Sequence, residues 1–256
     1  MTLRAGATSA TIDSVTVFSD RLRSRIARSG AAPLITYYDD STGERTELSA
    51  ISFGNWVDKT AGLIVDELLL DQGTPVRLDL ARTHPVHWVT LVWVAASWRA
   101  GCPVIIGGDA PDGAGVEVVG PTAAFDDHAG SVERVACSLH PFGLGFDRPL
   151  PVGVIDYGVE VRAQPDSFAG PTVRPTEQAW VDQGRRLTHG EIADVHQGPA
   201  DRTLIVPGAG DDPWSLVDEA LIRPVTSGGS VVIALGTDPE RRKSLIDSER
   251  VSRTVG

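Results

Sequence analysis

The stretch that decides the fold is PVRLDLARTHPVHWVTLVWVAASWRAGCPVII, residues 75–106. Residues 76–80 form a short β-rich run, and Pro85 opens a segment that is apolar almost all round as far as Arg99. A helix that is apolar on every side is usually buried. Gly101 ends this helix, and residues 103–106 form a second apolar strand. A strand, a helix and a strand in this order predict parallel strands joined by a right-handed crossover.

The same rhythm extends to both sides of this unit. Before it, the pattern predicts helices over 12–29 and 50–70 and strands over 33–38 and 44–48. After it, the pattern predicts strands at 116–119, 132–136, 203–206 and 230–235, and helices at 188–197, at 213–226 and from 237. Residues 140–151 predict a loop. The fold class is therefore α/β, with a mostly parallel sheet flanked by helices. We expect one domain over 12–256, behind a flexible N-terminus at 1–11, with an irregular middle segment at about 107–175.

Composition narrows the functions that are open to the chain. Of 256 residues, 23 are basic and 34 acidic, so the net charge is −11. This balance argues against nucleic-acid and anionic-membrane partners, because both need a basic face. The longest apolar run has about 13 residues, and a membrane span needs about 20. With no secretory signal in view, we expect a cytoplasmic protein. Only two residues are lysines, Lys59 and Lys243, and such Arg-rich usage is typical of a GC-rich bacterial genome.

Short motifs give weak signals. Residues 207–210, PGAG, lie between a strand and a helix, but only two of the three glycines of a dinucleotide-binding turn are present, so an ordinary turn is favoured. Neither a GxxxxGK[ST] loop nor a GxSxG elbow occurs. His84 and His87, three residues apart, could bring two metal ligands together, but a capping or surface role is favoured. Cys102 and Cys137 have apolar neighbours, which predicts buried free thiols.

Three stretches together carry a family resemblance. They are ERTELS (44–49) with the helix to Leu70, the segment 75–104 with RAGCPV, and LTHGEI (187–192) continuing to GGSVVI (228–233). In order and spacing they resemble the N-terminal domain of the AMP-binding, acyl-adenylate-forming enzymes, which include acyl-CoA synthetases, peptide synthetase adenylation domains and luciferases. The resemblance implies an α/β domain in which ligands lie beyond the carboxyl ends of the strands.

The chain departs from this family where the family binds ATP. The family's phosphate loop reads [ST]-S-G-T-T-G-x-P-K-G, and its amides and hydroxyls hold the phosphates. The matching place here is EQAWVDQGRR (177–186), where most of the loop is missing and Asp182 lies where an anion would bind. The resemblance implies that Arg185 or Arg186 takes the place of the lysine. The family's later adenine, ribose and hinge motifs, and the catalytic lysine of its C-terminal domain, would all lie beyond residue 256.

These departures leave three hypotheses. The first is a non-catalytic relative that binds a protein partner or a small ligand, with a homodimer as one arrangement. The second is an acyl-CoA synthetase or ligase with altered motifs, and the third is a generic α/β nucleotide binder that uses the turn at 207–210. The missing loop and lysine favour the first, so we expect no catalytic residue, metal or cofactor. The candidate ligand-binding residues, all at the carboxyl ends of strands or at helix starts, are Arg185, Arg186, Thr188, His189, Gly208, Gly210 and Asp211.

Overall fold

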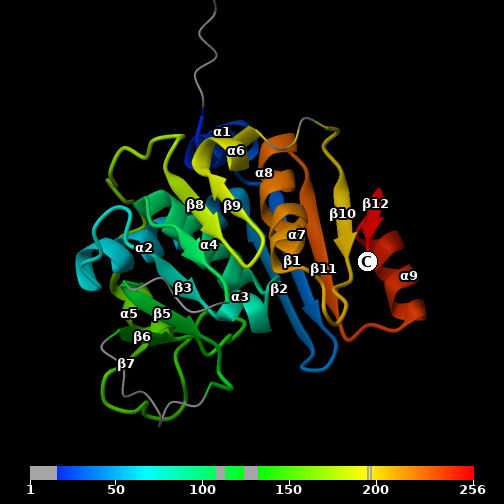
Figure 1. Ribbon diagram of the computed structural model, residues 1–256. Helices are drawn as coiled ribbons and strands as arrows, with labels where there is room; N and C mark the ends of the chain where they lie inside the picture. The colour runs from blue at the N-terminus through cyan, green and yellow to red at the C-terminus, as the bar shows by residue number, and fades with distance from the viewer. Residues whose placement is uncertain (1–15, 108–112, 124–131, 195, 197) are drawn as a thin grey trace, which may run out of the picture.

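The computed structural model describes residues 16–107, 113–123, 132–194, 196 and 198–256. The expected flexible N-terminus at 1–11 lies outside the described residues. The described strands form two sheets (Figure 1). The first contains β1 (Pro33–Asp39), β2 (Glu44–Ser49), β10 (Arg202–Ile205), β11 (Ser230–Leu235) and β12 (Arg253–Val255). The second contains β3 (Val76–Leu78), β4 (Val104–Ile105), β5 (Val116–Val119), β6 (Glu133–Ala136), β7 (Val154–Asp156), β8 (Gln178–Val181) and β9 (Arg186–Thr188).

Both sheets are almost entirely parallel. The strand order is β12-β10-β11-β1-β2 in the first sheet and β7-β6-β5-β3-β4-β8-β9 in the second. Only β2 beside β1, and β9 beside β8, run antiparallel in these sheets. The predicted α/β class with a mostly parallel arrangement is confirmed, although the strands divide between two sheets.

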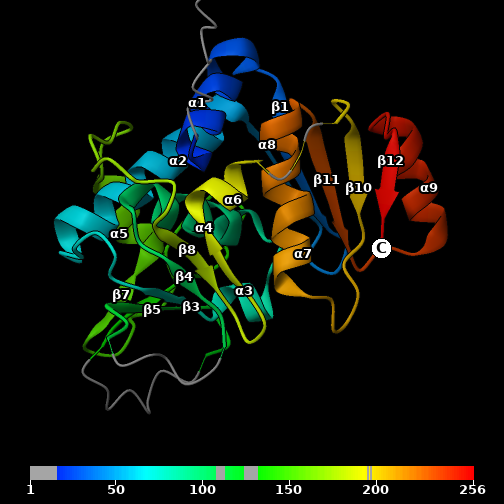
Figure 2. The same ribbon diagram turned by 45° about the horizontal axis from the view of Figure 1, so that its top comes forward.

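Helices join the two sheets. They are α1 (Phe18–Ser29), α2 (Ala50–Gly62), α3 (Leu80–Thr83), α4 (Trp88–Ala100), α5 (Tyr157–Ala163), α6 (His189–Asp194), α7 (Pro213–Val217), α8 (Arg223–Ser227) and α9 (Pro239–Ser248), with π turns η1 (Leu63–Glu67) and η2 (Asp218–Ile222). Helix α4 contacts β3 and β4 as well as α1 and α2, and α1 contacts α8, which packs on β11 (Figure 2). Helix α9 packs on the other face of the first sheet through Leu245, which lies against Tyr38 and Leu204.

Helix α4 is the centre of the core, as its sequence predicts. Of its residues, only Arg99 is not buried. It begins at Trp88 rather than at Pro85, because His87 has an extended backbone and its side chain accepts a hydrogen bond from the amide of Val89. It ends at Gly101, whose φ of 73° favours glycine.

Several predicted boundaries shift. The first helix begins at Phe18 with Val17 as its N-cap, and the helix expected over 50–70 changes to a π turn at Leu63. The helix over 213–227 contains η2 just before Pro224, which has no N–H to donate to the carbonyl one helical turn earlier. Four short elements, β7, α5, β8 and β9, lie in segments where the sequence predicted neither a strand nor a helix.

Candidate functional site

The carboxyl ends of strands from both sheets meet at a cavity of about 520 Å³, which we call the crevice. Its volume falls within the roughly 300–1,000 Å³ that is usual for small-molecule pockets. One wall comes from the ends of β1 and β11 and from the loop between β10 and α7, and the other from the connection between β3 and α4. Its lining residues are Tyr37, Arg82, Thr83, His84, Pro85, Val86, His87, Pro207, Gly208, Ala209, Gly210, Asp211, Pro213, Leu216 and Leu235.

Apolar groups form the inner walls of the crevice. Tyr37, Val86 and Leu216 are buried members of the main core. Asp211 and Arg82 are exposed, so the charges of the lining lie toward its rim. The crevice therefore offers an apolar interior with a few polar groups, which is the usual composition of a small-molecule site.

Carboxylates at the end of the loop from Pro207 to Asp212 accept hydrogen bonds from nearby backbone amides. The carboxylate of Asp211 accepts a hydrogen bond from the amide of Gly208 at 2.8 Å. Gly210 has φ of 90°, a conformation that favours glycine. Asp212 caps α7 by accepting from the amide of Ser215 at 3.2 Å. The amides of Gly208 and Ser215 are thus already held by carboxylates of the chain itself.

Arg185 links the β8–β9 turn to this loop. Its guanidinium lies 2.9 Å from a carboxylate oxygen of Asp182 and 3.0 Å from one of Asp212. Burial raises the pKa of Asp212, but hydrogen bonds from Arg185 and Ser215 outweigh burial and lower it below its ordinary value. Asp182 also accepts from the indole of Trp180 at 2.9 Å. The positive charge of Arg185 is therefore paired with two carboxylates of the chain.

The histidines beside the crevice are neutral. Burial lowers the pKa of His87 to about 3, and it also lowers the pKa of His84. Burial likewise raises the pKa of Tyr37, with Glu44 and Asp39 adding to the effect. At neutral pH this wall presents two uncharged imidazoles and an uncharged phenol.

The structure brings together only some of the predicted site residues. Gly208, Gly210 and Asp211 line the crevice, and Arg185 bonds to Asp212 next to them. Arg186 is exposed on β9. Thr188 is the last residue of β9, directly before α6, and its hydroxyl donates to the carboxylate of Glu191 at 2.8 Å.

His189 lies apart from the crevice lining. It is buried, its amide donates to the carbonyl of Glu177 at 3.0 Å, and burial lowers the pKa of its ring to about 4. Ligand binding by the residues predicted from the sequence stays a prediction.

Sequence reasoning missed the apolar part of the crevice lining. Tyr37, Val86, Leu216 and Leu235 are apolar or aromatic residues of ordinary strands and helices, with no motif to single them out. The sequence favoured a capping or surface role for His87, and in the structure His87 is the N-cap of α4. Its position in the crevice comes from the meeting of β1 with the β3–α4 connection.

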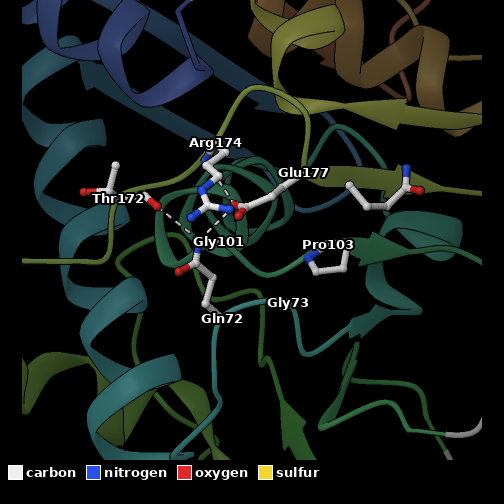
Figure 3. Close-up of a pocket in the computed structure, with 8 residues that line it drawn as sticks. Gln72, Gly73, Gly101, Pro103, Thr172, Arg174 and Glu177 are labelled. Atoms are coloured by element: carbon white, nitrogen blue, oxygen red, sulfur yellow. Dashed lines mark hydrogen bonds between the residues drawn. The ribbon is translucent and has the colours of Figure 1, made fainter.

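A second cavity, of about 400 Å³, lies at the amino ends of β3, β4 and β8 (Figure 3). Its polar groups bond to one another. Gln72 donates to Glu177 at 2.8 Å and to the carbonyl of Thr172 at 3.2 Å, and the amide of Arg174 donates to Glu177 at 3.0 Å (Figure 3). Parallel α/β sheets bind ligands at the carboxyl ends of their strands, so the crevice is the better candidate.

The described ranges contain neither a metal-binding cluster nor a helix that could span a membrane. Residues 16–107, 113–123, 132–194, 196 and 198–256 hold no group of three or more His, Cys, Asp or Glu residues that could bind a metal ion. Within the same described ranges, each helix is too short or too polar to cross a membrane.

Comparisons with known proteins agree with this fold. No family model matches the chain. It is 34% identical, over 235 residues, to a protein of Mycobacterium tuberculosis (strain ATCC 25618 / H37Rv) called "TIGR03089 family protein". The match covers 87% of this chain and 91% of that protein.

Solved structures share the fold at low identity. An acyl-CoA synthetase of Brucella canis matches with a TM-score of 0.68 and 14% identity, over 93% of this chain and 47% of that chain. The N-terminal domain of FACL13 from Mycobacterium tuberculosis matches with a TM-score of 0.67 and 14% identity, over 93% of this chain and 62% of that chain. Coronafacic acid ligase from Pectobacterium brasiliense matches with a TM-score of 0.67 and 10% identity, over 93% of this chain and 49% of that chain. The chain thus has the fold of the N-terminal domain of acyl-adenylate-forming enzymes, and spans 47–62% of these structures.

Proposed function

The chain belongs to the TIGR03089 family, and from that premise we propose that it is a non-catalytic relative of the acyl-adenylate-forming enzymes that binds a small ligand in the crevice. The fold supports the position of the site, because open α/β sheets bind ligands beyond the carboxyl ends of their strands. A cavity of about 520 Å³ with an apolar interior supports a small molecule as the occupant.

One observation carries the non-catalytic half of the proposal. The resemblance matches the family's phosphate loop to residues 177–186, and there Asp182 pairs with Arg185, which also pairs with Asp212. In the neighbouring loop, Asp211 accepts from the amide of Gly208. A triphosphate there would meet negative charge, and the amide of Gly208 already donates to a carboxylate of the chain.

The two lysines lie elsewhere. Lys59 pairs with Asp166 at 3.0 Å, and Lys243 lies on α9. Neither borders the crevice.

The second hypothesis, a ligase with altered motifs, depends on a free cation near the crevice loop. Arg185 is the residue placed to supply it, but it pairs with Asp182 and Asp212, whose negative charges would repel a phosphate. The third hypothesis, a generic nucleotide binder, called for a strand order unlike that of the adenylating enzymes, whereas the fold matches theirs with TM-scores of 0.67–0.68.

Pyrophosphate release tests the non-catalytic proposal. The protein would be incubated with magnesium, ATP and carboxylic acids of increasing chain length, alone and with cell extract, beside an active acyl-CoA synthetase as positive control. We expect no pyrophosphate above the level without protein. Release that requires a carboxylic acid and disappears in Arg185→Ala would contradict the proposal in favour of the ligase.

A protein partner, a homodimer and a cytoplasmic location remain predictions beside this proposal. Exposed large apolar side chains, such as Phe142 and Val159, support a protein partner because they offer it apolar surface to bury. Light scattering of the eluted protein tests the homodimer, and a monomer at all concentrations would contradict it.

A further inference from the structure

His87 presents a buried hydrogen-bond donor to the crevice. The side chain is 3% exposed and lines the cavity. Its Nδ1 accepts from the amide of Val89 at 3.2 Å, so in the neutral ring the proton lies on Nε2. Among the described residues, Nε2 has no hydrogen-bond partner. A carboxylate oxygen of Glu44 lies 4.0 Å from it, beyond hydrogen-bonding distance.

An unpaired donor at such depth costs free energy unless an acceptor reaches it. Leaving a buried polar group unsatisfied forfeits the hydrogen bonds that it made with water in the unfolded chain. Buried polar groups in folded proteins almost always have a partner. The described chain supplies none for Nε2, and the residue that carries this atom, His87, lines a cavity large enough for a small molecule. The missing acceptor therefore belongs to whatever occupies the crevice.

The charges around His87 limit what that acceptor can be. The Glu44 carboxylate lies close to the ring, Asp39 is near enough to affect its protonation, and Asp211 is on the opposite wall. An anionic oxygen would face these carboxylates in a partly apolar cavity. A purely cationic group offers only hydrogen-bond donors, whereas Nε2 of His87 is itself a donor and needs an acceptor. An uncharged carbonyl or amide oxygen meets neither objection.

The apolar residues of the lining indicate the chemical character of the rest of the ligand. Val86 and Leu216 are buried beside His87, and Pro85, Pro213 and Leu235 complete the apolar surface. Such walls favour an apolar or aromatic group through burial of its surface.

Building on the proposed function, we propose that the crevice binds an uncharged organic molecule whose carbonyl or amide oxygen accepts a hydrogen bond from Nε2 of His87 and whose apolar body lies against Val86 and Leu216. This assigns a ligand class that contains neither a phosphate nor a carboxylate.

Three probes of one shape test the proposal. Benzamide, benzoate and benzamidine differ mainly in charge: neutral, negative and positive. Each is titrated into full-length protein labelled with ¹⁵N-histidine, and the ring resonances of His87, assigned through His87→Asn, are followed. Ala209→Trp fills the crevice from its exposed loop, and Ala200→Trp adds the same group outside it.

We expect benzamide to shift the His87 resonances with at least tenfold higher affinity than benzoate or benzamidine. Ala209→Trp should weaken benzamide at least tenfold, and Ala200→Trp should leave it unchanged. If benzoate or benzamidine binds more tightly than benzamide and is still blocked by Ala209→Trp, the neutral-ligand inference is overturned while ligand binding in the crevice stands. If no probe moves His87 in either background, both the inference and the proposed ligand site are overturned.

Discussion

Acidification should destabilise the protein through its two buried neutral histidines. Burial lowers the pKa from 6.5 to about 3 for His87 and to about 4 for His189. Above pH 6.5 the rings are neutral in both the folded and the unfolded chain. Below it, the unfolded chain takes up protons that the folded chain refuses, so stability falls as the pH drops toward 4 and then 3.

The magnitude follows from these values. At pH 5 each histidine costs about 2 kcal/mol, and the two together cost about 4 kcal/mol relative to pH 8. Since the free energy of unfolding of a domain is commonly about 5–15 kcal/mol, this is a large share of it. Burial raises the pKa of Glu44 and of Asp218, so these groups act in the opposite direction. They are present in every variant and cancel in a comparison.

Urea unfolding at pH 8 and pH 5, followed by tryptophan fluorescence, measures the effect. His87→Asn keeps an oxygen that can cap α4, and His189→Gln removes the second ring. Each single variant should lose about 2 kcal/mol less than the unmodified protein between the two pH values. His140→Gln, in a surface loop, is the matched control and should behave like the unmodified protein. A double variant that loses as much stability as the unmodified protein would refute the reasoning.

Smaller changes test other parts of the structure. Gly210→Ala should lower the free energy of unfolding by about 1–2 kcal/mol in urea titrations, because φ is 90° at this position. The control Gly184→Ala, where an added Cβ meets nothing within 4 Å, should lower it by less. Equal losses in the two variants would contradict this expectation. Arg185→Ala should cost less than about 1 kcal/mol in thermal unfolding, because its ion pairs are partly exposed, and a larger loss would refute that view. Trp98→Phe removes the indole donor to the carbonyl of Ala179 at 2.9 Å and should cost about 1–3 kcal/mol; an unchanged urea midpoint would count against this bond.

The sequence predicts best those elements whose signals are local and long. Helix α4 is predominantly apolar and is followed by Gly101, so its place between β3 and β4 could be read directly, although its start lies at Trp88. Elements β7, α5, β8 and β9 are three to seven residues long. Segments of that length carry too little periodicity to separate them from loops.

The crevice could be predicted only in part. Gly208 and Gly210 follow a recognisable strand, so the rule about carboxyl ends of strands found them. Tyr37 and His87, fifty residues apart in sequence, meet as neighbouring rings 4.8 Å apart, and that meeting depends on how the two sheets pack. Arg185 was expected to offer a charge, but Asp182 and Asp212 pair with it in the folded chain.

The most direct measurement is a calorimetric titration of the protein with ATP in the presence of magnesium. If carboxylates of the chain occupy the place of the phosphates, no saturable heat appears at ATP concentrations up to the millimolar range, with or without magnesium. Tight, magnesium-dependent binding that Ala209→Trp abolishes would show a working nucleotide site in the crevice and would contradict the loss of phosphate recognition.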